Sequence, residues 1–206
     1  MHKRYAGMII ISILVMTGLV FGQSIVGSAH DFSTASWNTS GEICIVCHTP
    51  HNADVSVTNA PLWNHESTTA TFTPYSSASM DATVGQPDAS SKLCLSCHDG
   101  TVAVDNFGTT TSGTTTLTGS TLIGTNLLDD HPVSFTFNAA LANTDGGLHD
   151  PSTTSSGLGG TIDQDMLIGG QVQCASCHDV HNGSGLDMLL RKSNAGSELC
   201  LTCHAK

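Results

Sequence analysis

The sequence is poor in charged and aromatic side chains. Of its 206 residues, 11% are charged and 5% aromatic, and only six are lysine or arginine. A formal net charge of −11 excludes nucleic acid as a partner, because nucleic-acid binding needs a basic surface. The chain is rich in Thr, Ser and Gly, and its large apolar side chains are too few for an ordinary core of this length. Something other than side chains must therefore supply part of the interior.

An apolar run at residues 8–21 follows a basic start, and small residues stand at positions 27–29. This order is typical of a secretory signal peptide, which we place at residues 1–29. An uncleaved anchor is the alternative, but the run is short of the ~20 residues that span a bilayer, so we expect no stable membrane span after cleavage. We expect a secreted protein, extracellular or at the cell surface, with the periplasm as the alternative. Cleavage leaves 17 acidic residues against the basic residues Lys92, Arg191, Lys192 and Lys206.

All eight cysteines fall in four copies of the pattern Cys-x-x-Cys-His. Over one helical turn the two sulfurs of such a pattern can reach both vinyl groups of a porphyrin, and the following imidazole can bind the iron. Zinc sites and disulfides are the alternatives, but neither requires a histidine after every pair of cysteines. The spacing predicts four covalently bound haem c groups. The attaching and proximal residues are Cys44, Cys47 and His48; Cys94, Cys97 and His98; Cys174, Cys177 and His178; and Cys200, Cys203 and His204.

Four haems would also explain how a chain with so few large apolar side chains folds. A haem is a large, flat and mostly apolar body, so we expect stacked haems to form the core of a multihaem cytochrome c. The polypeptide around them is expected to be mostly coil, with short helices at the motifs and their flanks. A few short β-strands are expected in the Thr-rich middle, where Val133, Phe135 and Phe137 alternate with polar residues.

The motifs repeat in the order A, B, A, B. The first and third read Cys-x-x-Cys-His-x-x-His-Asn, whereas the second and fourth share Leu-Cys-Leu-x-Cys-His. This order predicts a first dihaem module at residues 30–110 and a second at residues 165–206. Residues 111–164, rich in Thr, Ser and Gly, are expected to connect the modules and to carry candidate distal ligands.

The sixth ligand of each iron decides the chemistry, because two imidazoles close the site and leave only electron transfer. Six histidines remain after the motifs and the signal are set aside: His30, His51, His65, His131, His149 and His181. We favour His51 and His181, which follow their proximal histidines by one helical turn and could reach a neighbouring haem. His131 precedes a proline that holds its backbone extended, His30 and His65 are further candidates, and His149 is the expected spare. The methionines Met80, Met166 and Met188 are weak competitors.

The sequence resembles the extracellular multihaem cytochromes of metal-reducing bacteria, and among them the tetrahaem nanowire cytochromes. The similarity lies in the motifs together with 30–33, 49–52, 61–65, 131–135 and 179–182. It implies bis-histidine haems in a continuous chain. It also implies a homopolymeric filament in which a histidine of one subunit ligates an iron of the next; His30, His51 and His65 are the candidates. Redox partner cytochromes and extracellular electron acceptors such as metal oxides are the other implied partners.

Two functional classes compete. We favour an electron carrier without catalytic residues, either a filament for extracellular electron transfer or a soluble periplasmic shuttle. The other class is a multihaem reductase of nitrite or hydroxylamine, which would need one iron with an open face beside acid–base groups. The surplus of histidines over irons favours the carrier.

Overall fold

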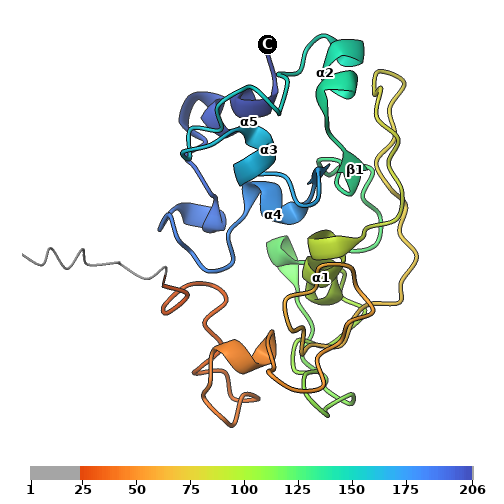
Figure 1. Ribbon diagram of the computed structural model, residues 1–206. Helices are drawn as coiled ribbons and strands as arrows, with labels where there is room; N and C mark the ends of the chain where they lie inside the picture. Colours follow the sequence, from red (N-terminus) through yellow and green to blue (C-terminus); the bar gives the residue numbers. More distant parts are fainter. Residues whose placement is uncertain (1–23, 206) are drawn as a thin grey trace, which may run out of the picture.

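The computed structural model describes residues 24–205. Most of residues 1–29, which we interpret as a signal peptide, and Lys206 lie outside this range. No helix within residues 24–205 is long and apolar enough to cross a membrane. Most of the described chain is loop and turn, interrupted by short helices and one two-stranded sheet, as the sequence predicts (Figure 1).

The helices are short and the sheet is minimal. The α-helices are α1 (Ala89–His98), α2 (Ala139–Asp145), α3 (Ile162–Asp165), α4 (Cys174–Cys177) and α5 (Glu198–Cys203). Single 3-10 turns, η1 to η4, occupy Cys44–Val46, Gly119–Thr121, Asp187–Leu189 and Ala195–Ser197. The strands are β1 (Phe135–Thr136) and β2 (Gln171–Val172), which pair antiparallel.

Each Cys-x-x-Cys-His motif lies on a helical turn. The second lies inside α1, the third and fourth coincide with α4 and the end of α5, and the first lies on η1. In the first, third and fourth motifs the N–H of the histidine donates to the carbonyl of the first cysteine, four residues earlier, at 2.8 to 3.1 Å. This is the helical hydrogen bond, and it confirms the expected helices at the motifs.

Two helices form outside the motifs, within the Thr-rich middle where mainly loops and strands were expected. Their ends explain them. The side chain of Asn138 accepts a hydrogen bond from the N–H of Leu141 at the start of α2. Thr161 and Gln164 form a reciprocal capping box at the start of α3. Such caps satisfy N–H groups that a helix start leaves without partners.

The alternation at residues 133–137 produces the expected strand. Phe135 and Phe137 are buried while Thr136 between them is exposed. Phe135 pairs with Val172 and Thr136 with Gln171. The sheet thereby connects the middle of the chain to the residues that lead into α4.

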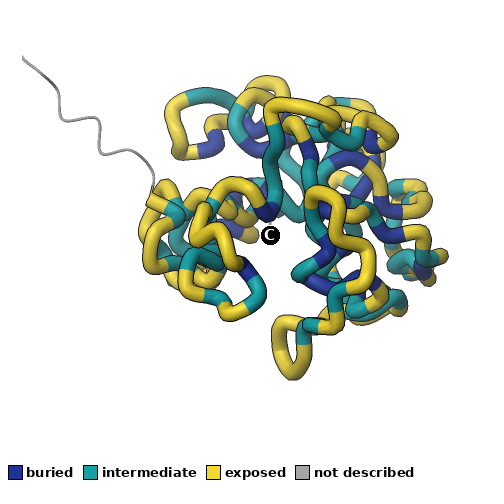
Figure 2. Tube along the Cα trace, turned by 90° about the horizontal axis from the view of Figure 1, so that it is seen from below, coloured by how far each residue is buried: buried dark blue, intermediate teal, exposed yellow. Residues whose placement is uncertain are grey.

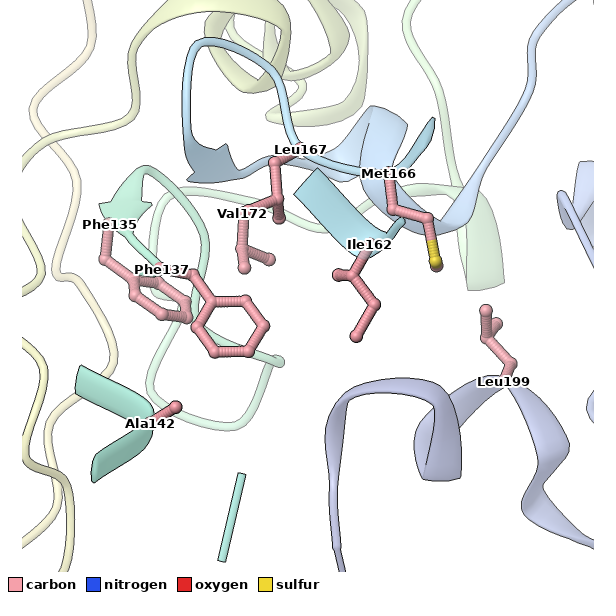
Figure 3. Packing of buried hydrophobic residues seen from close by; sticks show 8 residues of the cluster. All are labelled: Phe135, Phe137, Ala142, Ile162, Met166, Leu167, Val172 and Leu199. Atoms are coloured by element: carbon pink, nitrogen blue, oxygen red, sulfur yellow. The ribbon is translucent and has the colours of Figure 1, made fainter. Parts of the chain in front are cut away.

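The apolar side chains gather in three separate clusters. The largest contains Phe135, Phe137, Ala142, Ile162, Met166, Leu167, Val172 and Leu199. Figure 3 shows the two phenylalanine rings side by side near β1, and Met166 pointing toward Leu199 of α5. Two smaller clusters comprise Val57, Trp63 and Leu93, and Phe72, Leu95 and Leu127. The segment predicted to connect the two modules therefore supplies half of the largest cluster.

Burial along the backbone is confined to short stretches separated by exposed loops (Figure 2). In Figure 1, α1 and α4 lie next to each other at the centre, while η1 lies at one end of the molecule. The contact joins the last helix of residues 30–110 to the first motif of residues 165–206.

Candidate haem-binding site

The first motif is closed by a segment that returns after a loop. The N–H of Asn64 donates to the carbonyl of Cys47 at 2.9 Å. His48 and Trp63 then form an antiparallel bridge. The proximal histidine is thus held on both sides by main-chain hydrogen bonds, from the helical turn and from the returning segment.

The third motif is closed in the same way. The N–H of Arg191 donates to the carbonyl of Cys177 at 2.8 Å, and His178 and Leu190 form an antiparallel bridge. The sequence repeat between these motifs is therefore also a repeat of conformation.

The fourth motif uses a segment that precedes it in the chain. The N–H of His149 donates to the carbonyl of Cys203 at 2.8 Å, and Leu148 and His204 form the antiparallel bridge. His149, the expected spare histidine, thus takes part in closing a motif through its main chain.

The proximal imidazoles are oriented by backbone carbonyls. Nδ1 of His48 lies 2.6 Å from the carbonyl oxygen of Pro61, Nδ1 of His98 lies 2.7 Å from that of Thr121, and Nδ1 of His178 lies 2.8 Å from that of Met188. A carbonyl can only accept, so each ring donates its Nδ1–H. The lone pair is then on Nε2, as metal ligation through Nε2 requires.

Three non-motif histidines lie against three proximal histidines. The ring centroids are 6.2 Å apart for His48 and His181, 6.1 Å for His98 and His30, and 6.4 Å for His204 and His131. The angles between the ring planes are 18°, 55° and 79° in that order. A metal–imidazole bond is about 2 Å long, so two imidazoles on opposite sides of one iron have centroids roughly 6 Å apart. The spacing of all three pairs suits two axial ligands of one iron.

Of the three other non-motif histidines, His51 and His65 differ in exposure. His51 is exposed on the loop after the first motif. His65 is 2% exposed; its Nδ1 lies 2.8 Å from the carbonyl of Glu66 and its Nε2 3.0 Å from that of Ala103. Burial, the largest effect, lowers the pKa of His65. Main-chain carbonyls thus already contact both of its ring nitrogens.

Apolar side chains that remain exposed stand beside the motifs. Leu62 follows Pro61, whose carbonyl orients His48, and Met188 itself supplies the carbonyl that orients His178. Leu122 follows Thr121, whose carbonyl orients His98. These three are 58%, 79% and 42% exposed. Ile45, Ile123, Val180 and Leu201, next to or within the motifs, are also exposed. Apolar surface gathered around the motif histidines fits a large apolar group such as a haem.

Zinc sites fit less well. Residues 24–205 contain no group of three or more His, Cys, Asp or Glu side chains that could hold a metal ion. Burial raises the pKa of the free thiol of Cys47 to about 11 and that of Cys97 to about 12. Cys174 differs: a hydrogen bond from Cys94 lowers its pKa to about 7 against the opposing effect of burial.

Residues 168–206 match the family described as the doubled CXXCH motif. This segment is therefore similar to paired CXXCH domains. Such domains are typical of multihaem c-type cytochromes, and their motifs indicate covalently bound haem c. The match covers the third and fourth motifs; the first two are identified by their sequence alone. No curated protein matches the chain at a significant level.

The carbonyl acceptors are the functional groups that sequence reasoning missed. Every residue has a carbonyl, so Pro61, Thr121 and Met188 carry no recognisable signal by themselves. The sequence repeat gives a partial signal, because a leucine follows the acceptor residue in both the first and the third motif. These leucines, Leu62 and Leu189, both have positive φ, 53° and 55°.

Proposed function

We propose that the protein is a tetrahaem c-type cytochrome that carries electrons by hopping from haem to haem, as a subunit of an extracellular filament. The observation that supports it best is the set of three imidazole pairs, each joining a motif histidine to a non-motif histidine at 6.1 to 6.4 Å. Haem supplies the one-electron chemistry, and the chain supplies attachment, orientation and exclusion of water.

In this proposal His30, His131 and His181 are distal ligands, and each serves a motif other than its nearest neighbour in sequence. Ligation requires neutral imidazole. Burial first, and then the neighbouring histidines His98, His178 and His181, lower the pKa of His30 to about 4, so that its ring is neutral near pH 7. Its Nδ1 is buried without a hydrogen-bond partner among the described residues.

Paired imidazoles favour a carrier over a reductase. An iron with imidazole on both faces has no position for nitrite or hydroxylamine. The three pairs assign no distal ligand to the iron of His178. The sixth ligand of this iron therefore distinguishes a carrier from a reductase.

We assign His51 of a neighbouring subunit to this iron. Of the three bridging candidates, His30 lies against His98 and His65 is buried, whereas His51 is exposed. An iron–imidazole bond between subunits would also offset repulsion between two strongly acidic chains, whose formal charge is −11 each before signal removal. A soluble periplasmic shuttle remains the alternative within the carrier class.

Haem quantitation and spectroscopy test the carrier proposal. We expect four haems per secreted chain by pyridine haemochrome assay, all low-spin in assembled protein. Fewer than four haems would contradict the tetrahaem proposal. A persistent high-spin fraction of one iron in four in assembled material would favour a reductase.

Electron microscopy of material sheared from cells tests the filament. We expect filaments from the wild type, and from His51→Ala we expect dispersed four-haem subunits with one high-spin iron. His149→Ala is the matched control, because we assign no iron to His149, and it should still form filaments. Filaments of low-spin His51→Ala protein would overturn the assignment of the bridge.

A further inference from the structure

The second and third motifs meet at the contact between α1 and α4. The helices α1 and α4, which carry these motifs, pack against each other. The N–H of Cys174 also donates to Oγ of Ser91, on α1, at 3.0 Å. The attachment points of two haems from different halves of the chain are therefore held side by side.

One buried side chain joins the elements around this contact. Gln173, the residue before Cys174, is 1% exposed. Its Oε1 accepts from the N–H of Ser91 at 3.1 Å and from Oγ of Ser134 at 3.2 Å. Its Nε2 donates to Oδ1 of Asp88 at 2.8 Å and to Oε1 of Gln171 at 3.1 Å. Both ends of the carboxamide are thus fully used.

The partners of Gln173 are themselves linked. Oγ of Ser134 accepts from the N–H of Asp88 at 3.0 Å, and the N–H of Gln173 donates to Oγ of Ser176 within α4 at 2.9 Å. Ser91, Ser134 and Ser176 are all buried. The carboxamide of Gln173 and the three serines are buried and satisfied, and this fixes one arrangement of their elements, because any shift leaves buried donors or acceptors unpaired.

We propose that Gln173 is a positioning residue that sets the relation between the haems of the second and third motifs, and thereby the electron path between the two halves of the chain. This inference rests on the proposed function, because it requires haems on both motifs. Gln173 acts through α1 and α4, and the proximal histidine nearest to it in the sequence, His178, is five residues away. Removing its carboxamide should therefore alter the relation between two haems without removing either haem or any axial ligand.

The test is Gln173→Leu in the secreted, haem-loaded protein. The leucine is similar in size but leaves the N–H of Ser91 and the carboxylate of Asp88 without their partner. We expect four haems by pyridine haemochrome and unchanged near-infrared ligand bands. The excitonic Soret couplet in circular dichroism, which reports the relative placement of neighbouring haems, should lose most of its amplitude.

Gln86→Leu is the matched control. Gln86 also makes two hydrogen bonds, to the N–H and carbonyl of Phe72, but it joins two loops rather than two haem-attaching helices. The Soret couplet of Gln86→Leu should equal that of the wild type. A wild-type couplet in fully loaded Gln173→Leu would overturn the inference.

A milder variant tests the same inference if Gln173→Leu does not accumulate. Ser91→Ala removes the acceptor for the N–H of Cys174 and leaves Gln173 in place. A reduced couplet at four haems is expected, and an unchanged one would overturn the inference. The haem content of the wild type is measured first, so that a chain with fewer than four haems is recognised as a failure of the proposed function itself.

Discussion

The first and third motifs have the same local closure but different surroundings. In both, a returning segment bridges the proximal histidine, and a carbonyl from that segment orients Nδ1 of His48 or His178. The residue before the first cysteine differs: it is the partly exposed Ile43 in the first motif and the buried Gln173 in the third. Gln173 binds the third motif into the centre of the molecule, whereas η1 lies at one end (Figure 1).

The difference separates two tasks. Local closure orients the imidazole of the motif and needs only the motif and a returning segment. Placement of a motif relative to the others needs side chains that reach a second helix. The first motif has the first property, and the third has both, so equivalent changes in the two should have unequal effects.

Removing the cysteines should give the largest difference in yield between variants of the first and the third motif. Cys174→Ala with Cys177→Ala removes the attachment of a haem at the central contact, where Cys177 packs against the largest apolar cluster. We expect this variant to fail to accumulate. Cys44→Ala with Cys47→Ala removes a haem at the end of the molecule, and we expect a folded chain with three haems. Haem-stained gels of the secreted fraction measure both; equal yields would remove the distinction.

Trp63 and Leu190 occupy equivalent positions in the two returning segments and allow a second comparison. Trp63 is 8% exposed in its own small cluster, so Trp63→Ala should cost roughly 3–5 kcal/mol in the free energy of unfolding. Leu190 is only partly buried against the largest cluster, so Leu190→Ala should cost less, about 2 kcal/mol at the low end of leucine truncations. Guanidinium denaturation followed by far-ultraviolet circular dichroism measures both values, and a larger loss at Leu190 would contradict this ranking.

His51 and His181 hold equivalent positions in the repeat and should have separable roles. His181→Met should change the near-infrared ligand band of one iron in four in isolated subunits, because the ring centroid of His181 lies 6.2 Å from that of His48. His51→Met should leave the isolated subunit unchanged, because we assign its imidazole to a neighbouring chain. Near-infrared bands of isolated His181→Met identical to those of the isolated wild type would reject the intrachain pair.

The smallest effects test the local closure itself. Asn52 and Asn182 both have left-handed backbone, with φ of 56° and 57°. Alanine at either position should cost about 1 kcal/mol, since a Cβ-bearing residue without a polar side chain disfavours this region. Glycine should be near neutral. Urea denaturation measures all four variants; unequal costs for the two alanine variants would show that the closures are not equivalent.

Much of the local structure follows from sequence spacing alone. Cys-x-x-Cys-His predicts a helical turn because one turn places both cysteines and the histidine where a single haem can reach them. The alternation of Phe135 and Phe137 specifies a strand with one buried face because side chains in a strand alternate between faces. The helices α2 and α3 could have been found from Asn138 and Thr161, which precede them as caps.

Sequence by itself determined the four Cys-x-x-Cys-His motifs and the inventory of further imidazoles, because each depends on residue type and short spacing. Tertiary structure alone decided that His181 lies against His48, His30 against His98 and His131 against His204. It also decided which carbonyls orient the rings, and that Gln173 joins two helices. These relations connect residues far apart in the chain, and they depend on where the loops cross in space rather than on any periodicity of the residues.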